Sequence, residues 1–85
     1  MSPVVLTLYS RPGCHLCEEM KETVAPVARQ LGCTVTQVDI SGDPELERRY
    51  ATEIPVLLIN GRKAFKYRLT ERELRRRLRA EEGEG

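Results

Sequence analysis

The first third of the chain predicts a buried strand followed by an amphipathic helix. Residues 4–9 form an almost continuous run of apolar and β-favouring side chains, which is typical of a strand buried on both faces. In residues 15–31, apolar positions then recur every three or four residues, so one stripe of a helix should face the sheet. The stripe consists of Leu16, Met20, Val24, Val27 and Leu31. Gly32 is expected to end this helix.

The middle of the chain predicts a second strand, a short helix and a third strand. Residues 33–40 are rich in β-branched side chains, and a helix joining two strands favours a right-handed unit with parallel strands. Asp43 and Pro44 should begin the short helix, which ends near residues 50–52. Residues 55–59 form the third strand, and the Asn-Gly pair after it predicts a tight hairpin.

The last part of the chain predicts an edge strand and a final helix, with their inward and outward positions set by alternation. The edge strand is predicted at residues 62–68. Phe65, Tyr67 and, just beyond the strand, Leu69 are expected to face the core, whereas Lys66 and Arg68 are expected to face solvent. A capping box is expected to begin the helix, which should bury two leucines; these residues are Thr70, Glu73, Leu74 and Leu78. The predicted fold class is α/β, in the order β-α-β-α-β-β-α, with a four-stranded mixed sheet flanked by helices. Residues 1–80 form one domain, and residues 81–85 a frayed acidic tail.

The charge balance and the cysteine count of the chain indicate which partners and which cellular compartment to expect. The 14 basic and 13 acidic residues nearly balance, so neither a nucleic acid nor a membrane is expected as a partner, and we expect a monomer. Five arginines crowd the last helix as a mainly solvated face, or alternatively as a docking patch for an acidic protein: Arg72, Arg75, Arg76, Arg77 and Arg79. Three cysteines and no signal-like segment favour a cytoplasmic protein with reactive thiols; Cys33 is expected as a small buried hydrophobic residue.

The Cys14-His15-Leu16-Cys17 motif carries the candidate chemistry. Two thiols at this spacing can exchange disulfides, bind a metal or remain inert. A cysteine at a helix N-terminus meets unpaired N–H groups and the positive end of the helix dipole, which favour the reactive thiolate. Cys17 lies one turn further on, close enough to close a ring with Cys14. A protonated His15 would favour the thiolate further; the alternative is an exposed histidine without a partner.

A metal site is the alternative from another class of protein. Cys14 and Cys17 are soft ligands, and His15 could be a third, as in a copper(I) or zinc carrier or an iron–sulfur cluster bridged by a dimer. A closed structural zinc site needs four ligands, and the chain has no second cysteine pair, so we expect no bound metal. A dithiol that senses oxidation without turnover is a third reading.

The chain resembles the glutaredoxin form of the thioredoxin fold. The resemblance rests on a Cys-x-x-Cys motif between the first strand and helix, on Ile54-Pro55 before the third strand, and on the Asn-Gly hairpin. It implies a thiol–disulfide oxidoreductase in which Cys14 attacks and Cys17 resolves. Its substrates would be protein disulfides or glutathione-mixed disulfides, with a thioredoxin-type reductant as a further partner. It also implies a cis Pro55 and an Ile54 backbone whose N–H and C=O both pair with an extended substrate.

Two features bear on whether glutathione is the co-substrate. Arg11 lies where glutaredoxins often carry a basic residue facing a glutathione carboxylate, although a solvated loop arginine is the alternative. Typical glutaredoxins have a Gly-Gly pair and then an Asp after the hairpin. Residues 64–70 contain neither glycine nor aspartate, so part of the expected glutathione site is missing.

Overall fold

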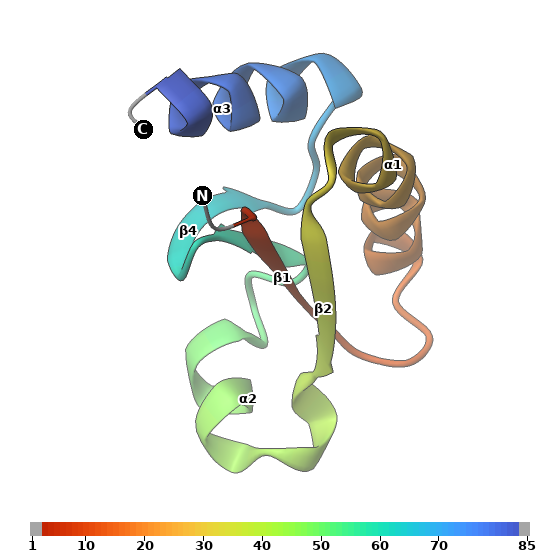
Figure 1. The fold of residues 1–85 in the computed structure, drawn as a ribbon. Helices are drawn as coiled ribbons and strands as arrows, with labels where there is room; N and C mark the ends of the chain where they lie inside the picture. Colours follow the sequence, from red (N-terminus) through yellow and green to blue (C-terminus); the bar gives the residue numbers. More distant parts are fainter. Residues whose placement is uncertain (1–2, 84–85) are drawn as a thin grey trace.

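The computed structural model describes residues 3–83 and centres on a four-stranded sheet (Figure 1). The strands are β1 (Val5–Ser10), β2 (Thr34–Asp39), β3 (Val56–Ile59) and β4 (Arg62–Lys66). The helices are α1 (His15–Leu31), α2 (Pro44–Tyr50) and α3 (Glu71–Gly83), with a short 3-10 helix, η1 (Ile40–Gly42), before α2. The predicted order of helices and strands is confirmed.

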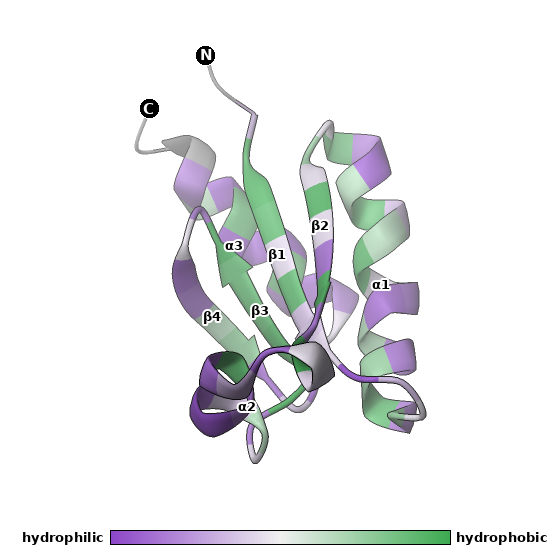
Figure 2. Ribbon diagram, turned by 90° about the horizontal axis from the view of Figure 1, so that it is seen from below, coloured by the Kyte–Doolittle hydropathy of each residue, from purple (hydrophilic) through white to green (hydrophobic). Residues whose placement is uncertain are grey.

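The sheet is mixed, as predicted, and its strand order is β2-β1-β3-β4. β1 pairs in parallel with β2 and antiparallel with β3, and β3 pairs antiparallel with β4. All four residues of β3 are buried, whereas β2 at the edge is mostly exposed. Figure 2 shows the same contrast, with hydrophobic β3 between β1 and β4 and a strongly hydrophilic α2.

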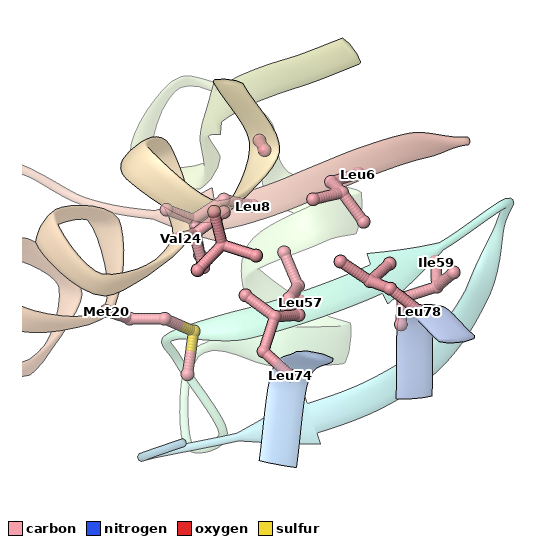
Figure 3. Packing of buried hydrophobic residues seen from close by; sticks show 10 residues of the cluster. Leu6, Leu8, Met20, Val24, Leu57, Ile59, Leu74 and Leu78 are labelled. Atoms are coloured by element: carbon pink, nitrogen blue, oxygen red, sulfur yellow. The ribbon is translucent and has the colours of Figure 1, made fainter. Parts of the chain in front are cut away.

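The core lies where α1 and α3 cover one face of the sheet (Figure 3). Leucines and isoleucine of β1 and β3 meet the apolar faces of the two helices in one cluster: Leu6, Leu8, Met20, Val24, Val27, Ala28, Leu57, Ile59, Leu74 and Leu78. The prediction for Leu31 is wrong. This last residue of α1 is 41% exposed, so the buried stripe ends one turn earlier, at Ala28.

Each helix begins or ends where local chemistry predicts. α1 ends at Gly32, whose left-handed backbone (φ 72°) lets its N–H donate to the Ala28 carbonyl. Asp43 caps α2 by accepting hydrogen bonds from two backbone N–H groups of the first turn. The capping box of α3 is present, since Thr70 Oγ1 accepts from the Glu73 N–H and the Glu73 carboxylate accepts from the Thr70 N–H.

Two expectations at the ends of elements need correction. Cys33 precedes β2 and is only partly buried against the core, so it is not a fully buried side chain. α3 continues through residues 81–83, where fraying was expected, and residues 84 and 85 lie outside the described part of the chain. On α3 the arginines are exposed or half-buried, and Arg75 pairs with Glu71 and Gln30.

β4 is shorter than predicted and loses its alternation at a bulge. The register shifts between Leu57 and Leu58, so that Leu57 lies opposite Phe65 but Leu58 lies opposite Lys63. The strand ends at Lys66, and Tyr67 has a left-handed backbone with φ 69°. Its side chain is 44% exposed, so the prediction that Tyr67 faces the core is wrong. Within residues 3–83, no helix is both long and apolar enough to cross a membrane.

Candidate redox-active site

Strand pairing gathers the predicted site residues at one end of the sheet. Tyr9, near the end of β1, lies opposite Val56 at the start of β3, and Val56 lies opposite Lys66 at the end of β4. The segments just beyond these residues therefore meet at the same edge. They are the loop 11–14 that leads to α1, the segment 52–55 before β3, and the segment 67–69 after β4.

The loop into α1 places Cys14 at the N-cap of the helix. Gly13 has a φ of 76°, a left-handed conformation that glycine adopts without steric cost. Cys14 itself is extended (φ −90°, ψ 109°), and its carbonyl accepts the first helical hydrogen bond, from the Glu18 N–H, at 3.2 Å. The Cys17 N–H donates to Cys14 Sγ at 3.2 Å. A sulfur that accepts a backbone N–H at a helix N-terminus is favoured as the thiolate when the pair is reduced.

The two cysteines are joined by a disulfide, with a Cα–Cα distance of 5.2 Å across one turn of α1. Their exposure differs: Cys17 is 3% exposed, whereas Cys14 is half-buried. An incoming sulfur can therefore reach Cys14 but not Cys17. This asymmetry matches the roles that the family resemblance gives to the two thiols.

His15 points into solvent, away from any buried partner. Its side chain is 88% exposed, and its Nε2 lies 3.7 Å from the Glu19 carboxylate one turn along α1. Solvent screens charge interactions at such an exposed position. Any effect of His15 on Cys14 must therefore be modest, and its role as a tuning residue stays a prediction.

Arg11 is drawn toward η1 and α2. Its Nη2 lies 3.7 Å from a Glu47 carboxylate oxygen, and its Nε is buried without a hydrogen-bond partner among the described residues. Hydrogen bonds from the side chain and backbone of Ser41, helped by the Arg11 charge, hold the pKa of Asp39 below its usual value of 3.8. Arg11 thus has carboxylate neighbours within the chain, and its contact with a substrate stays a prediction.

The Ile54–Pro55 peptide bond is cis. The N–H of Ile54 donates to the Tyr50 carbonyl at the end of α2, at 3.0 Å. This corrects the expectation that both backbone groups of Ile54 pair with a substrate. The donor is already engaged, so an added strand could use only the Ile54 carbonyl.

Tyr67 is the site residue that the sequence did not indicate. Its N–H donates to the Pro55 carbonyl at 2.8 Å, and its hydroxyl donates to the Thr52 carbonyl at 3.0 Å. A left-handed backbone costs a non-glycine residue about 1–2 kcal/mol, and two hydrogen bonds of about 1 kcal/mol each offset it. The tyrosine therefore holds the 52–55 segment at the expense of local strain. The only sequence feature that could have indicated this role of Tyr67 is that residues 64–70 lack the glycine pair typical of glutaredoxins.

A groove opens between α1 and the 67–69 segment, with a volume of about 140 Å³. One of its walls begins at Leu16, which lies between the two cysteines in the motif. The lining residues are Leu16, Glu19, Met20, Thr23, Tyr67, Arg68 and Leu69. The groove therefore includes a residue adjacent in sequence to both cysteines and the 67–69 segment, whose Tyr67 N–H is bonded to the Pro55 carbonyl, so it lies at the same edge of the sheet as the dithiol.

Among residues 3–83, no cluster of three or more histidine, cysteine or acidic side chains could hold a metal ion. Cys14 and Cys17 are the soft ligands at this end of the sheet, and they are bonded to each other. A metal ion would need the reduced pair and ligands beyond those that residues 3–83 bring together.

The ion pair between Glu53 and Lys63 yields a testable pH effect. A hydrogen bond from Lys63 holds the pKa of Glu53 below its usual value of 4.5, so the folded state favours the ionised carboxylate. This contribution to stability is present above the unfolded pKa and is lost as the pH falls through the folded pKa. We expect Glu53→Gln to lower the free energy of unfolding at pH 7, and the difference from wild type to shrink toward pH 3 in urea denaturation.

A double-mutant cycle is the control for this effect. In a Lys63→Met background, Glu53→Gln should leave the pH dependence of unfolding unchanged, because the cause of the shift is gone. The same pH-dependent difference with and without Lys63 would contradict the assignment.

Comparison with known proteins places this site in a family. The model of the family described as Glutaredoxin-like domain (DUF836) matches residues 5–79. A solved structural genomics target from X. campestris is 37% identical, with a TM-score of 0.75, and the match covers 88% of this chain and 96% of that one. A curated glutaredoxin-like protein of Dictyostelium discoideum is 30% identical over 77 residues, which are 81% of this chain and 69% of that protein.

The likeness to thioredoxins lies in the fold alone. The thioredoxin of Fasciola hepatica is 16% identical, with a TM-score of 0.66, over 92% of this chain and 80% of that one. Both structures share the mixed sheet flanked by helices, which confirms the predicted thioredoxin-like architecture. With a dithiol at the start of α1 and a family match over most of its length, the chain belongs to the glutaredoxin-like domain family.

Proposed function

We propose that the protein is a thiol–disulfide oxidoreductase in which Cys14 is the attacking thiolate and Cys17 the resolving thiol. One observation carries the proposal. A half-buried cysteine at the N-cap of α1 is bonded to a cysteine one turn along that is 3% exposed. Such a pair has one accessible sulfur activated by the helix N-terminus and one protected sulfur within bonding reach.

The reaction proceeds in two exchanges. The Cys14 thiolate attacks one sulfur of a substrate disulfide; a Cys14–substrate bond forms, the substrate S–S bond breaks, and its other sulfur leaves as a thiolate. Cys17 then loses its proton and attacks Cys14 Sγ, which re-forms the Cys14–Cys17 bond and releases the second substrate thiolate. Two electrons pass from the dithiol to the substrate. A thiol or dithiol reductant must reopen the bond before the next cycle.

The substrates would be protein disulfides or glutathione-mixed disulfides, with glutathione or a thioredoxin-type protein as the reductant. The 64–70 segment lacks glycine and aspartate, so one expected support of bound glutathione is absent, and Arg11, the other, also lies 3.7 Å from Glu47. A reducing compartment such as the cytoplasm suits a dithiol that must be regenerated.

Two alternatives use the same cysteines. In a soft-metal or iron–sulfur module, Cys14 and Cys17 would both be ligands of one ion or cluster, which needs the disulfide to be open. In a redox sensor, the bond would form and break without passing electrons to a substrate. The difference in exposure between the two cysteines supports the oxidoreductase, because exchange uses one thiol that a substrate reaches first and a second, protected thiol that resolves the mixed disulfide.

Replacing each cysteine separately tests the proposed roles. In a Cys33→Ser background, the reduced Cys17→Ser variant should accumulate a mixed disulfide with a disulfide-linked peptide, because no resolving thiol remains. The matched Cys14→Ser variant should form almost none, because Cys17 is buried. Intact-protein mass spectrometry measures both adducts. Equal adducts in the two variants, or none in Cys17→Ser, would contradict the assignment.

The tuning role of His15 has its own test. If a protonated His15 stabilises the Cys14 thiolate, His15→Ala should move the pH dependence of Cys14 alkylation to higher pH, by less than about one unit because the side chain is exposed. His15→Lys, which keeps a positive charge, is the control and should retain the wild-type profile. An unchanged profile in His15→Ala would remove His15 from the site.

A further inference from the structure

The groove between α1 and the 67–69 segment has apolar side chains in its lining, among them Leu16, Met20 and Leu69. Met20 is buried, and Leu16 and Leu69 are half-buried walls that leave part of their apolar surface open. Charged and polar side chains form the rest of the lining, with Glu19 from α1 and Arg68 from the facing segment. A lining that mixes apolar and polar side chains can bind one apolar group and fix its orientation through the polar ones.

The size and position of the groove identify the kind of occupant. Its volume of about 140 Å³ is close to that of a cavity that accepts a benzene ring, so it can hold one leucine, methionine or phenylalanine side chain. Leu16 is adjacent in sequence to both cysteines, and Tyr67 on the opposite wall is bonded to Pro55, so we expect a side chain in the groove to belong to a residue near the substrate's cysteine. Glutathione has no apolar side chain to bury there, whereas a protein segment can supply one.

Tyr67 gives the groove its wall on the side of β4. The backbone of Tyr67 has φ 69°, a conformation that glycine adopts without steric cost, yet this position carries the bulkiest side chain of the groove. The ring cannot move freely, since the N–H is bonded to Pro55 and the hydroxyl to Thr52. Lys66 Nζ also lies 5.5 Å from the centre of the ring. A side chain held at both ends in a strained conformation is a fixed wall.

We infer that Tyr67 is the specificity-determining residue of the exchange reaction. It limits the groove near Cys14–Cys17 to the size of one apolar side chain. Protein disulfides whose cysteine has an apolar neighbouring residue are therefore selected over glutathione disulfide. This rests on the proposed oxidoreductase function and adds the substrate class to it. Through its bonds to Thr52 and Pro55, Tyr67 also positions the segment that carries the Ile54 carbonyl, toward which an extended substrate can donate.

The experiment compares three probes with the reduced protein. They are a disulfide-linked dimer of a Leu-Cys-Leu peptide, the matching Gly-Cys-Gly dimer, and glutathione disulfide. Wild type should prefer the leucine probe over both others by about tenfold or more in kcat/KM, the usual range for an apolar group in a fitted pocket. The preference should reside mainly in KM, because the attacking sulfur is the same for every probe.

Two variants separate the ring from the hydroxyl. Tyr67→Gly removes the ring while keeping a backbone that tolerates φ 69°, so the fold is retained; it should bring all three probes within about twofold of one another. Tyr67→Phe keeps the aromatic ring that forms the wall of the groove and loses only the hydrogen bond to the Thr52 carbonyl. It should therefore retain most of the wild-type preference for the leucine probe. Tyr50→Phe, in a tyrosine that stacks on Tyr9 outside the groove, is the matched control and should behave as wild type.

The outcomes distinguish this inference from the proposed function. If wild type reduces the three probes equally well, or if Tyr67→Gly keeps the preference for leucine, the role of Tyr67 is overturned while the oxidoreductase stands. If wild type reduces none of the three probes, as expected for Cys14→Ser, then both the oxidoreductase function and the role of Tyr67 are rejected. The rate of Cys14 alkylation should be the same in wild type and both Tyr67 variants; a change there would assign Tyr67 to the chemistry of the thiol and overturn a role in specificity.

Discussion

The antiparallel pairing of β1 with β3 is the interaction on which the candidate site depends. It sets the end of β1, from which the Cys14 loop departs, beside the start of β3, where Pro55 lies. β4 then pairs with β3 and brings Tyr67 to the same edge. A slip of one residue in either pairing would exchange the two faces of the strand, so that Leu57 and Ile59 would leave the cluster that they form with α1 and α3; their packing there fixes the register and thereby the site.

Within that frame, position rather than residue type makes the cysteines different. Cys14 and Cys17 are three residues apart, yet one is a half-exposed N-cap whose sulfur accepts a backbone N–H and the other is buried in the first turn of α1. Cys33, a third thiol of the same intrinsic chemistry, lies before β2 and outside the N-terminal turn of any described helix. In the proposed reaction, the helix start favours the thiolate at Cys14, and burial protects Cys17 until Cys14 has reacted.

Local rules predict most of the fold because they act within a few residues. The helix caps at Gly32, Asp43 and Thr70 could be predicted from the sequence for that reason. The errors come from contacts between distant segments. The bulge in β4 and the bonds from Tyr67 to Thr52 and Pro55 override the alternation that pointed Tyr67 inward. The dithiol was predictable because its motif and helix are adjacent in sequence, whereas the groove needs two segments about fifty residues apart.

The most direct test of the account is a redox titration of the Cys14–Cys17 pair against glutathione and thioredoxin redox buffers, with metal content measured on the same sample. Two electrons should enter and leave the pair reversibly in metal-free protein, and Cys33→Ser should leave the titration unchanged. A protein that retains stoichiometric metal and shows no exchange with either buffer would contradict the account, because both cysteines would then be ligands.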